Sequence, residues 1–482
     1  MSMPRAASSQ PTPSLGVVEG SRPGLVRGLS LLDSVLLLCG GIIGSGIFLT
    51  AGQIAEQVRT PGLFLLVWVA GGMISLLACF AFAELGSMFP SAGGQYVYLR
   101  EAYGEFWAFL YGWMNFAVSG AGTIAALAVG FAEYFGVLIP VFSARIPVAH
   151  IGGWAFTRGH AVAIASIVVL TAINVLGLRR AALFQNVATF LKFAAIAIFV
   201  ALGFLIGKGS WSNFTAPAEP NVGVSPFAAF GVALIAVFWA YDGWVYITWV
   251  AGEVKDPRRN VPRALVIGVI VVGVLYIALN AVYLYALPVA RIAGETTIAQ
   301  TAAVSLFSPD AAGWLAAMIA VSCFGAMSSG ILCYARVYYA MAMDGTFFRS
   351  MAYVHPRYRT PSFSLVVQGI WTVVLALSGT YEQLFTYTMF MMVLSYVATV
   401  AGLFVLRYKR PDAPRPYRCS GYPWVPALYI LIGGAWALNA AVERPTEAVA
   451  GIAICLIGVP GYLYWRRRSQ ARPVALPEST QP

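Results

Sequence analysis

The sequence predicts an all-α polytopic membrane protein, and three properties of the chain carry that prediction: its composition, its long apolar runs and its uneven charge. Of the 482 residues, 59% are hydrophobic and only 10% are charged. Soluble domains carry roughly 25% charged residues, which they use to cover a water-facing surface. This chain lacks the polar side chains for such a surface, so we expect lipid to face much of it.

Apolar runs long enough to span a bilayer as a helix, about 20 residues each, occur twelve times. The expected transmembrane helices are 31–55, 62–89, 104–138, 160–178, 184–207, 226–252, 263–289, 312–345, 362–379, 383–407, 422–442 and 446–466. Residues 1–30 are polar and show no apolar segment typical of a cleavable signal. We expect a disordered cytoplasmic tail there and a second cytoplasmic tail at 467–482.

Lysine and arginine are distributed unevenly between the two sides of this topology. If the N-terminus is cytoplasmic, 22 of them fall on the cytoplasmic side and six on the outer side. Such a bias is the positive-inside rule, and it predicts that both termini are cytoplasmic and that the number of spans is even. The net charge of +11 then reflects topology and contact with membrane lipid rather than nucleic-acid binding. The expected location is the plasma membrane, which is the inner membrane in a bacterium.

Two of the expected spans carry signals of a broken helix. Span 1 has four glycines and a serine near its middle: Gly40, Gly41, Gly44, Ser45 and Gly46. Each glycine costs a helix roughly 1 kcal/mol relative to alanine, and freed backbone groups in a bilayer must meet protein, ligand or water. Span 6 has Tyr241-Asp242-Gly243 at its centre, a carboxylate beside a glycine. The alternative interpretation is that the small residues only allow close helix packing.

The two breaks lie five spans apart, so the two broken spans cross the membrane in opposite directions. This is the arrangement of an inverted repeat, with 31–207 and 226–407 as its five-helix halves and 422–466 as accessory helices 11 and 12. Paired interruptions predict a substrate site at the membrane midplane. Half-helix N-termini suit a carboxylate and half-helix C-termini suit an ammonium group, so an amino acid matches both.

Several longer motifs carry a resemblance that covers most of the chain, from about residue 33 to 430. They are GGIIGSGIF in span 1, FAELGSMFPSAGGQYVYL after span 2, FWAYDGW with AGEVKDPRRNVPRAL in and after span 6, ARVYYAMAMDGTFF with HPRYRTPS after span 8, and RPDAPRPYRCSGYPWVP before span 11. Together these motifs resemble permeases of the amino acid–polyamine–organocation (APC) superfamily, in particular the L-amino-acid transporter branch.

This resemblance implies a LeuT-like fold, which is a 5+5 inverted repeat with broken helices 1 and 6. It also implies transport by alternating access and an α-amino acid substrate bound between helices 1 and 6. The family's carboxylate-binding turn corresponds to Ile43, Gly44, Ser45 and Gly46. Its amine-facing segment corresponds to Trp239, Ala240, Tyr241, Asp242 and the adjoining Gly243, with Trp239 as the aromatic residue that covers substrate. Many animal members have glycine in place of Asp242 and asparagine in place of Val245, so their side-chain selectivity does not carry over.

Lys192 is the only lysine inside an expected span. A lysine there costs roughly 2.5–3.5 kcal/mol on insertion scales, which makes it a candidate functional residue. The alternative is that it reaches the cytoplasmic surface, about 12 Å away along the helix. The resemblance implies that its ammonium group takes the place of a sodium ion and steadies spans 1 and 8. We therefore expect a sodium-independent carrier.

Asp242 lies at about the same depth as Lys192, some 15 Å from the inner end of its span. The two side chains could pair directly or through water. In another interpretation, Asp242 caps the N-terminus of the second half of span 6. A further hypothesis is that Asp242 carries a proton during transport.

Other classes of protein find less support. The three histidines have no metal-ligand spacing, no CxxC occurs among the six cysteines, and no two carboxylates lie together in mid-membrane. We therefore expect no enzyme, no metal and no cofactor. A channel would need rings of carbonyls or like charges and remains the alternative from a different class. We expect a secondary-active carrier of neutral L-amino acids that works as an exchanger, uniporter or proton symporter. The alternative within the class is a polyamine or cationic amino-acid antiporter.

Partners follow from the resemblance and from one absence in the sequence. Relatives that are linked to a heavy subunit carry a cysteine between spans 3 and 4, whereas residues 139–159 here contain none. We therefore expect no disulfide-linked partner, and a protein that is a monomer or a weak homodimer.

Overall fold

The computed structural model describes residues 24–143, 145–151, 154–217, 225–378, 381–443 and 445–470. Most of the two expected tails, at 1–30 and 467–482, lies outside these residues. In the first half of the chain the elements are α1 (Leu31–Ile42), α2 (Gly46–Val58), α3 (Pro61–Met88), α4 (Gln95–Tyr103), α5 (Glu105–Met114), the π-helix η1 (Asn115–Ser119), α6 (Gly120–Leu138), the 3₁₀ turn η2 (Pro140–Phe142), β1 (Pro147–Ile151), β2 (Trp154–Thr157), α7 (Arg158–Val175), α8 (Leu178–Leu205) and the 3₁₀ turn η3 (Trp211–Thr215).

The regular elements of the second half of the chain, within its described residues, are all helices. Its elements are α9 (Pro226–Ala240), α10 (Tyr246–Trp249), η4 (Ala251–Glu253), α11 (Pro257–Ala286), α12 (Val289–Ile292), α13 (Ile298–Leu306), α14 (Ala311–Met343), η5 (Arg349–Ala352), α15 (Ser362–Ser378), α16 (Tyr381–Lys409), α17 (Trp424–Glu443), α18 (Pro445–Ile457) and α19 (Val459–Gln470). Each of the twelve expected spans overlaps one of these helices or a run of consecutive ones.

Helix length and apolar composition identify a multi-pass membrane protein. Within the described ranges, eight helices are long and apolar enough to cross a membrane, and α1 with α2, bent by 47°, would make a ninth span. Three further apolar helices are shorter: α9, α15 and Trp424–Asn439 of α17. The total of twelve spans stays a prediction.

The spans begin at residues that favour a helix start. The side chain of Ser30 accepts a hydrogen bond from the amide of Asp33, and Asp33 accepts one in return from the amide of Ser30, which is a capping box. Proline occupies the first helical position of α3, α9 and α11, where its missing N–H is not needed. Asn186 of α8 also donates a hydrogen bond to Asp33, which ties the start of α1 to span 5.

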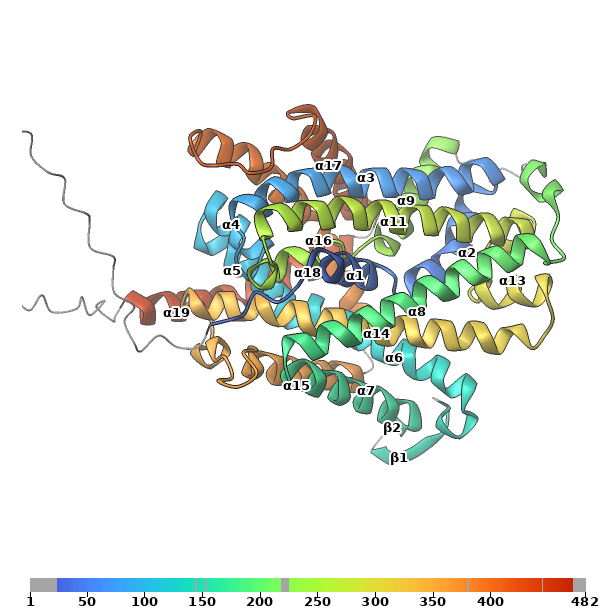
Figure 1. Ribbon diagram of the computed structural model, residues 1–482, viewed down its shortest axis with the longest axis horizontal. Coiled ribbons are helices and arrows are strands. Elements are labelled where there is room, and N and C mark those ends of the chain that lie inside the picture. The colour runs from blue at the N-terminus through green and yellow to red at the C-terminus, as the bar shows by residue number, and fades with distance from the viewer. Residues whose placement is uncertain are drawn as a thin grey trace, which may run out of the picture.

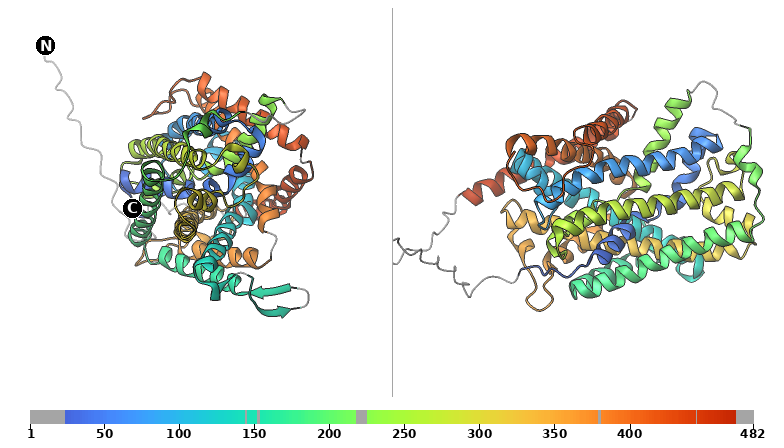
Figure 2. Two further views of the ribbon diagram at one scale, coloured as in Figure 1. Left: turned by 90° about the vertical axis from the view of Figure 1, so that its right-hand side faces the viewer. Right: turned by 45° about the horizontal axis from the view of Figure 1, so that its top comes forward.

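The long helices α3, α8, α11 and α14 run roughly along the long axis of the molecule, with the short α1 near its middle (Figure 1). α1 packs against α8, α11 and α14, and α2 packs against α9. α14 lies within the bundle (Figure 2). Of its most apolar 18-residue stretch, 78% is buried, compared with 28% of the corresponding stretch of Ala448–Arg468 in α18 and α19. The last helices therefore lie at the periphery, and α14 lies at the core.

A short hairpin differs from the all-α prediction. β1 and β2 form an antiparallel hairpin between α6 and α7, with Ile151 opposite Trp154 and Pro147 opposite Thr157. The all-α prediction missed this hairpin, because its strands are only five and four residues long. The start of the described chain and the end of α19 lie toward the same end of the molecule, at the left of Figure 1.

Candidate functional site

The helix of span 1 is interrupted between Ile42 and Gly46. The amide of Ile43 still donates to the carbonyl of Cys39 at 2.9 Å, but the amide of Gly44 turns to the carbonyl of Ile42 at 2.8 Å. α2 then starts afresh at Gly46. In its first turn the amide of Phe48 donates to the carbonyl of Ser45 at 3.0 Å, whereas the amides of Gly46 and Ile47 precede any possible acceptor within the helix. A Cβ on Gly46 would lie 3.1 Å from the Cα of Ala240, which shows how closely span 6 approaches this break.

The helix of span 6 is interrupted between Ala240 and Tyr246. Gly243 has φ +107°, a conformation that L side chains rarely adopt. A Cβ on Gly243 would also lie 2.8 Å from the carbonyl group of Gly41. Glycine is therefore required twice at this position, by the backbone turn and by the contact with span 1, and the two breaks lie directly against each other.

One tyrosine of span 7 joins the two breaks. The hydroxyl of Tyr276, on α11, donates to the carbonyls of Ile42 at 3.1 Å and Ala240 at 3.0 Å. These are the last residues of α1 and α9, whose carbonyls lack intrahelical donors. Tyr276 is fully buried. The sequence argument missed it, because a tyrosine in an apolar span carries no signal beyond its hydroxyl group.

Lys192 turns toward the first break rather than toward the cytoplasmic surface. Its ammonium group, 1% exposed, donates to the carbonyls of Gly40 at 2.8 Å and Ile43 at 2.7 Å. On the α14 side, a Cβ on Gly325 would lie 2.9 Å from the Cε of Lys192, so glycine there leaves room for the lysine. Ser322 of α14 donates to the carbonyls of Ile43 and Gly44. A cation and a hydroxyl group thus satisfy the C-terminal end of α1, where positive charge is favourable.

Asp242 is held by span 10. The hydroxyl of Tyr396, on α16, donates to the carboxylate of Asp242 at 2.6 Å. The predicted direct pair between Asp242 and Lys192 is absent among the described ion pairs, because both contacts of the ammonium group go to α1 carbonyls. The predicted N-cap role is also wrong: α10 starts after Val245 and has no side-chain cap, because Gly243 delays the helix.

A small cavity of about 50 Å³ lies between the two breaks. Its walls come from spans 1, 3, 6 and 8: Gly41, Ile42, Gly44, Ser45, Gly46, Thr123, Ala126, Leu127, Trp239, Asp242, Tyr246 and Ala326. This space holds a few water molecules, at about 10–15 Å³ each by the same measure. An amino acid would require the walls to separate.

The predicted site residues fall into two groups around this cavity. Gly44, Ser45, Gly46, Trp239 and Asp242 line it. Ile43, Ala240, Tyr241 and Gly243 lie at the breaks but are not among its lining residues.

Tyr241 shows why a residue at a break need not face the cavity. Its ring is fully buried and its hydroxyl donates to the carbonyl of Trp68 on α3 at 3.0 Å. The side chain therefore braces span 6 from behind rather than facing the cavity.

A π-helical segment in span 3 supports one wall of the cavity. Within η1, the carbonyl of Asn115 accepts from the hydroxyl of Tyr338 at 3.0 Å, and that of Ala117 accepts from the indole of Trp371 at 2.9 Å. Such segments leave carbonyls available to partners outside the helix and occur often at functional sites. η1 precedes Thr123 and Leu127 and so sets which face of α6 they occupy. No sequence signal identified it.

A buried ion pair joins α14 to η4, next to the N-terminal segment of the described chain. Arg336 of α14 donates to both oxygens of Glu253 in η4, at 2.6 and 3.0 Å, and neither side chain is more than 1% exposed. The backbone carbonyl of Glu253 also accepts from the amides of Gly28 and Leu29. Spans 6 and 8 and the N-terminal segment are therefore fastened together here.

The fold and the site define a class: a multi-pass membrane transport protein in which two interrupted helices meet around a small cavity. Comparison with known proteins identifies the family. A sequence model described as "Amino acid permease" matches residues 29–459, so the chain belongs to the amino acid permease family.

Individual relatives match over most of their length. The chain is 31% identical to the serine/threonine exchanger SteT of Bacillus subtilis over 450 residues, which are 92% of this chain and 98% of that protein. It is 29% identical to the human b(0,+)-type amino acid transporter 1 (88% and 84% covered). It is 28% identical to the human large neutral amino acids transporter small subunit 2 (96% and 85% covered).

Proposed function

We propose that this chain is a secondary-active carrier that moves amino acids across the membrane by alternating access. The observation that carries the proposal is the contact between two broken helices around one cavity. The first-turn amides of α2 provide donors on one side, and the C-terminal end of α9 provides carbonyls on the other. A zwitterion fits this pair of half-helix ends.

In the proposed complex, the substrate carboxylate binds to the turn Ile43–Gly46 and the ammonium group binds to the segment Trp239–Gly243. Trp239 lines the cavity and covers the bound substrate. The substrate is a neutral L-amino acid, a class supported by the names of the serine/threonine and large neutral relatives. Asp242 in the cavity wall makes a cationic amino acid or a polyamine the second candidate.

Transport is independent of sodium in this proposal. The ammonium group of Lys192 lies against the carbonyls of Gly40 and Ile43, where a coupling cation would otherwise find oxygen ligands. It contacts α1 directly and packs beside Gly325 of α14. This geometry supports a lysine that steadies spans 1 and 8 in place of an ion. Exchange, the activity in the name of the bacterial relative, is the favoured mode, ahead of uniport and proton symport.

The proposed architecture has twelve spans in a LeuT-like arrangement, with repeats at 31–207 and 226–407 and accessory helices at 422–466. Contacts between counterpart helices support the repeat: α2 packs on α9, α3 on α11, α6 on α14 and α7 on α15. A pseudo-two-fold axis between the halves would produce such pairs. The positive-inside bias supports cytoplasmic termini, in the plasma membrane or the bacterial inner membrane.

The carrier proposal leaves no chemical step to the chain, and the relatives are transporters. Residues 139–159 contain no cysteine, so we propose a carrier without a disulfide-linked subunit, either a monomer or a weak homodimer.

Uptake into proteoliposomes tests the proposed function. Vesicles loaded with unlabelled amino acids should accumulate labelled neutral amino acids, saturably and without sodium, and empty liposomes serve as the control. A competition panel of the twenty amino acids plus putrescine would separate neutral from cationic substrates. Uptake of no amino acid or amine would contradict the proposal, and a non-saturable ion current would favour a channel.

A further inference from the structure

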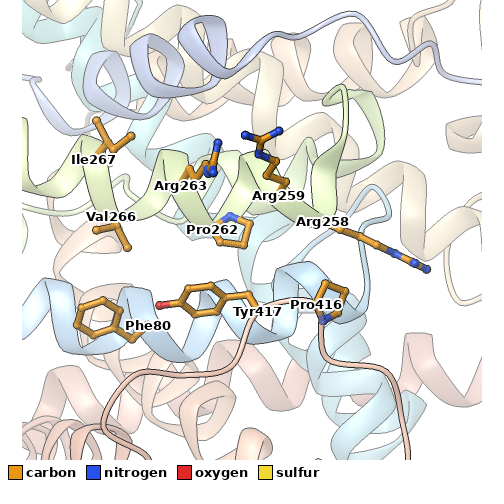
Figure 3. Close-up of a pocket in the computed structure, with 9 residues that line it drawn as sticks. All are labelled: Phe80, Arg258, Arg259, Pro262, Arg263, Val266, Ile267, Pro416 and Tyr417. Atoms are coloured by element: carbon orange, nitrogen blue, oxygen red, sulfur yellow. The ribbon is translucent and has the colours of Figure 1, made fainter.

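A second and larger cavity lies far from the substrate site, on the outside of the helix bundle. It has a volume of about 510 Å³ and lies between the first turns of α11, the last third of α3 and the segment before α17 (Figure 3). Arg258, Arg259 and Arg263 line it together with Phe80, Val266 and Tyr417. The cavity is thus basic toward the start of α11 and apolar further along.

The three arginines are not engaged by acidic side chains. All three are exposed, and none takes part in an ion pair within the part of the chain that the structure describes. Asp256 precedes them, but it is not among the lining residues and forms no such pair either. Three unneutralised cations on two consecutive turns make a strong local attraction for an anion.

The opposite wall is held firmly in place. The amide of Tyr417 donates to Ser87 at 3.2 Å, and the amide of Cys419 donates to the buried carboxylate of Glu84 at 2.7 Å. Arg415 pairs with the same carboxylate. The segment that carries Tyr417 is therefore fastened to α3, and the cavity has fixed walls on both sides.

The lining of the cavity extends along α11. From Arg258, in the first turn of α11, to Ile267 the helix rises about 14 Å. The side chain of Ile267 is 42% exposed on the outside of the helix bundle. A ligand here needs an anionic group at one end and an apolar chain at the other. A free phosphate would satisfy the arginines but would leave the wall of Phe80, Val266 and Tyr417 uncovered.

We propose that this cavity is a binding site for an anionic phospholipid of the cytoplasmic leaflet. Its phosphate group binds to Arg258, Arg259 and Arg263, and an acyl chain lies along Phe80, Val266 and Tyr417. Basic pockets between helices on this side of membrane proteins are suited to such headgroups. Because the walls belong to α11, α3 and the segment before α17, the lipid bridges spans that are distant in the sequence.

Native mass spectrometry of the purified full chain in detergent tests the site, with phosphatidylglycerol as the probe and phosphatidylcholine as the neutral comparison. The parent should retain one phosphatidylglycerol in preference to phosphatidylcholine. The triple variant Arg258→Gln, Arg259→Gln, Arg263→Gln should bind it at least about tenfold more weakly, since each arginine near an anionic surface contributes roughly fivefold.

The matched control removes the same charge elsewhere. Arg179→Gln, Arg180→Gln, Arg349→Gln changes three exposed arginines without touching the cavity and should bind like the parent. A second variant, Val266→Trp, fills the apolar end and should also weaken binding with all arginines present. Equal losses in the two arginine triples, or an unchanged Val266→Trp, would overturn the proposal. Glycerol phosphate, which lacks an acyl chain, tests whether a soluble phosphate is the ligand. If glycerol phosphate raised the thermal stability of the protein as much as phosphatidylglycerol does, the proposal would also be overturned.

Discussion

Among the residues that the structure describes, two cations are buried in the spans, and they are stabilised by different partners. Arg336 meets the carboxylate of Glu253 through two hydrogen bonds. Lys192 meets no carboxylate; its ammonium group binds the carbonyls of Gly40 and Ile43. The backbone carbonyl of Ile43 is available to the ammonium group because α1 ends one residue earlier, at Ile42. The arginine therefore fastens spans together, whereas the lysine depends on the break itself.

The largest effect on stability is expected from neutralising Glu253, the partner of Arg336. Glu253→Gln leaves the guanidinium group of Arg336 buried without a counter-charge, which costs about 3–5 kcal/mol. Thermal unfolding of the purified protein should show this loss. The double variant Arg336→Met, Glu253→Leu removes both charges and should recover much of it; a double variant as unstable as the single one would show that the pair is not what stabilises this region.

A smaller loss of stability is expected at Lys192. Lys192→Met leaves the carbonyl of Gly40 without its donor, at about 1–3 kcal/mol, whereas the carbonyl of Ile43 keeps its hydrogen bond from Ser322. The variant also removes the cost of burying a charge. Amino-acid uptake should nevertheless fall at least about tenfold, because the break loses its brace. Uptake by the parent should be equal with and without sodium. A variant with parental uptake would show that the lysine is only structural.

A third comparison asks whether the carbonyls at the breaks matter more than other buried hydrogen bonds. Tyr276→Phe removes the hydroxyl shared by Ile42 and Ala240, and Tyr241→Phe removes one bond to Trp68. Each should cost about 0.5–1.5 kcal/mol of stability. Only Tyr276→Phe should change the substrate affinity, measured as the KM for uptake. Equal KM shifts in both variants would argue against a special role for the breaks.

The smallest effect on transport is expected at Asp242. The carboxylate of Asp242 accepts a hydrogen bond from the neutral phenol of Tyr396, whereas that of Glu253 pairs with the charged guanidinium group of Arg336. If Asp242 carries a proton, uptake by the parent should respond to a pH gradient and uptake by Asp242→Asn should not. Tyr396→Phe keeps the carboxylate and serves as the control that should still respond. A response that persists in Asp242→Asn would assign the proton to another group.

The positions of both breaks were predictable because their causes are local. Clustered glycines around Gly44 weaken a helix wherever it lies, and Gly243 beside a carboxylate does the same. The apolar runs likewise predicted helices, since lipid requires each span to satisfy its own backbone. Tyr276, Ser322 and the π-helix η1 were not predictable, because each acts on a carbonyl that belongs to a distant segment.

Asp242 shows the same limit from the other side. Its depth suggested Lys192 as a partner, but depth leaves the direction around the helix axis open. The structure turns Asp242 toward Tyr396 and Lys192 toward Ile43. For Arg336 too, only packing could select Glu253 from η4 as the partner.

The sequence by itself determined that this chain is a multi-pass membrane protein of the amino acid permease family and that two of its helices carry glycine-rich interruptions. Those properties follow from composition, local backbone preference and motif, each of which is readable along the chain. Only the tertiary structure decided which groups satisfy the carbonyls freed at the breaks and which arginines form no ion pair within the described part of the chain. Those outcomes depend on the rotation and contact of helices that are far apart in the sequence, and no local pattern encodes them.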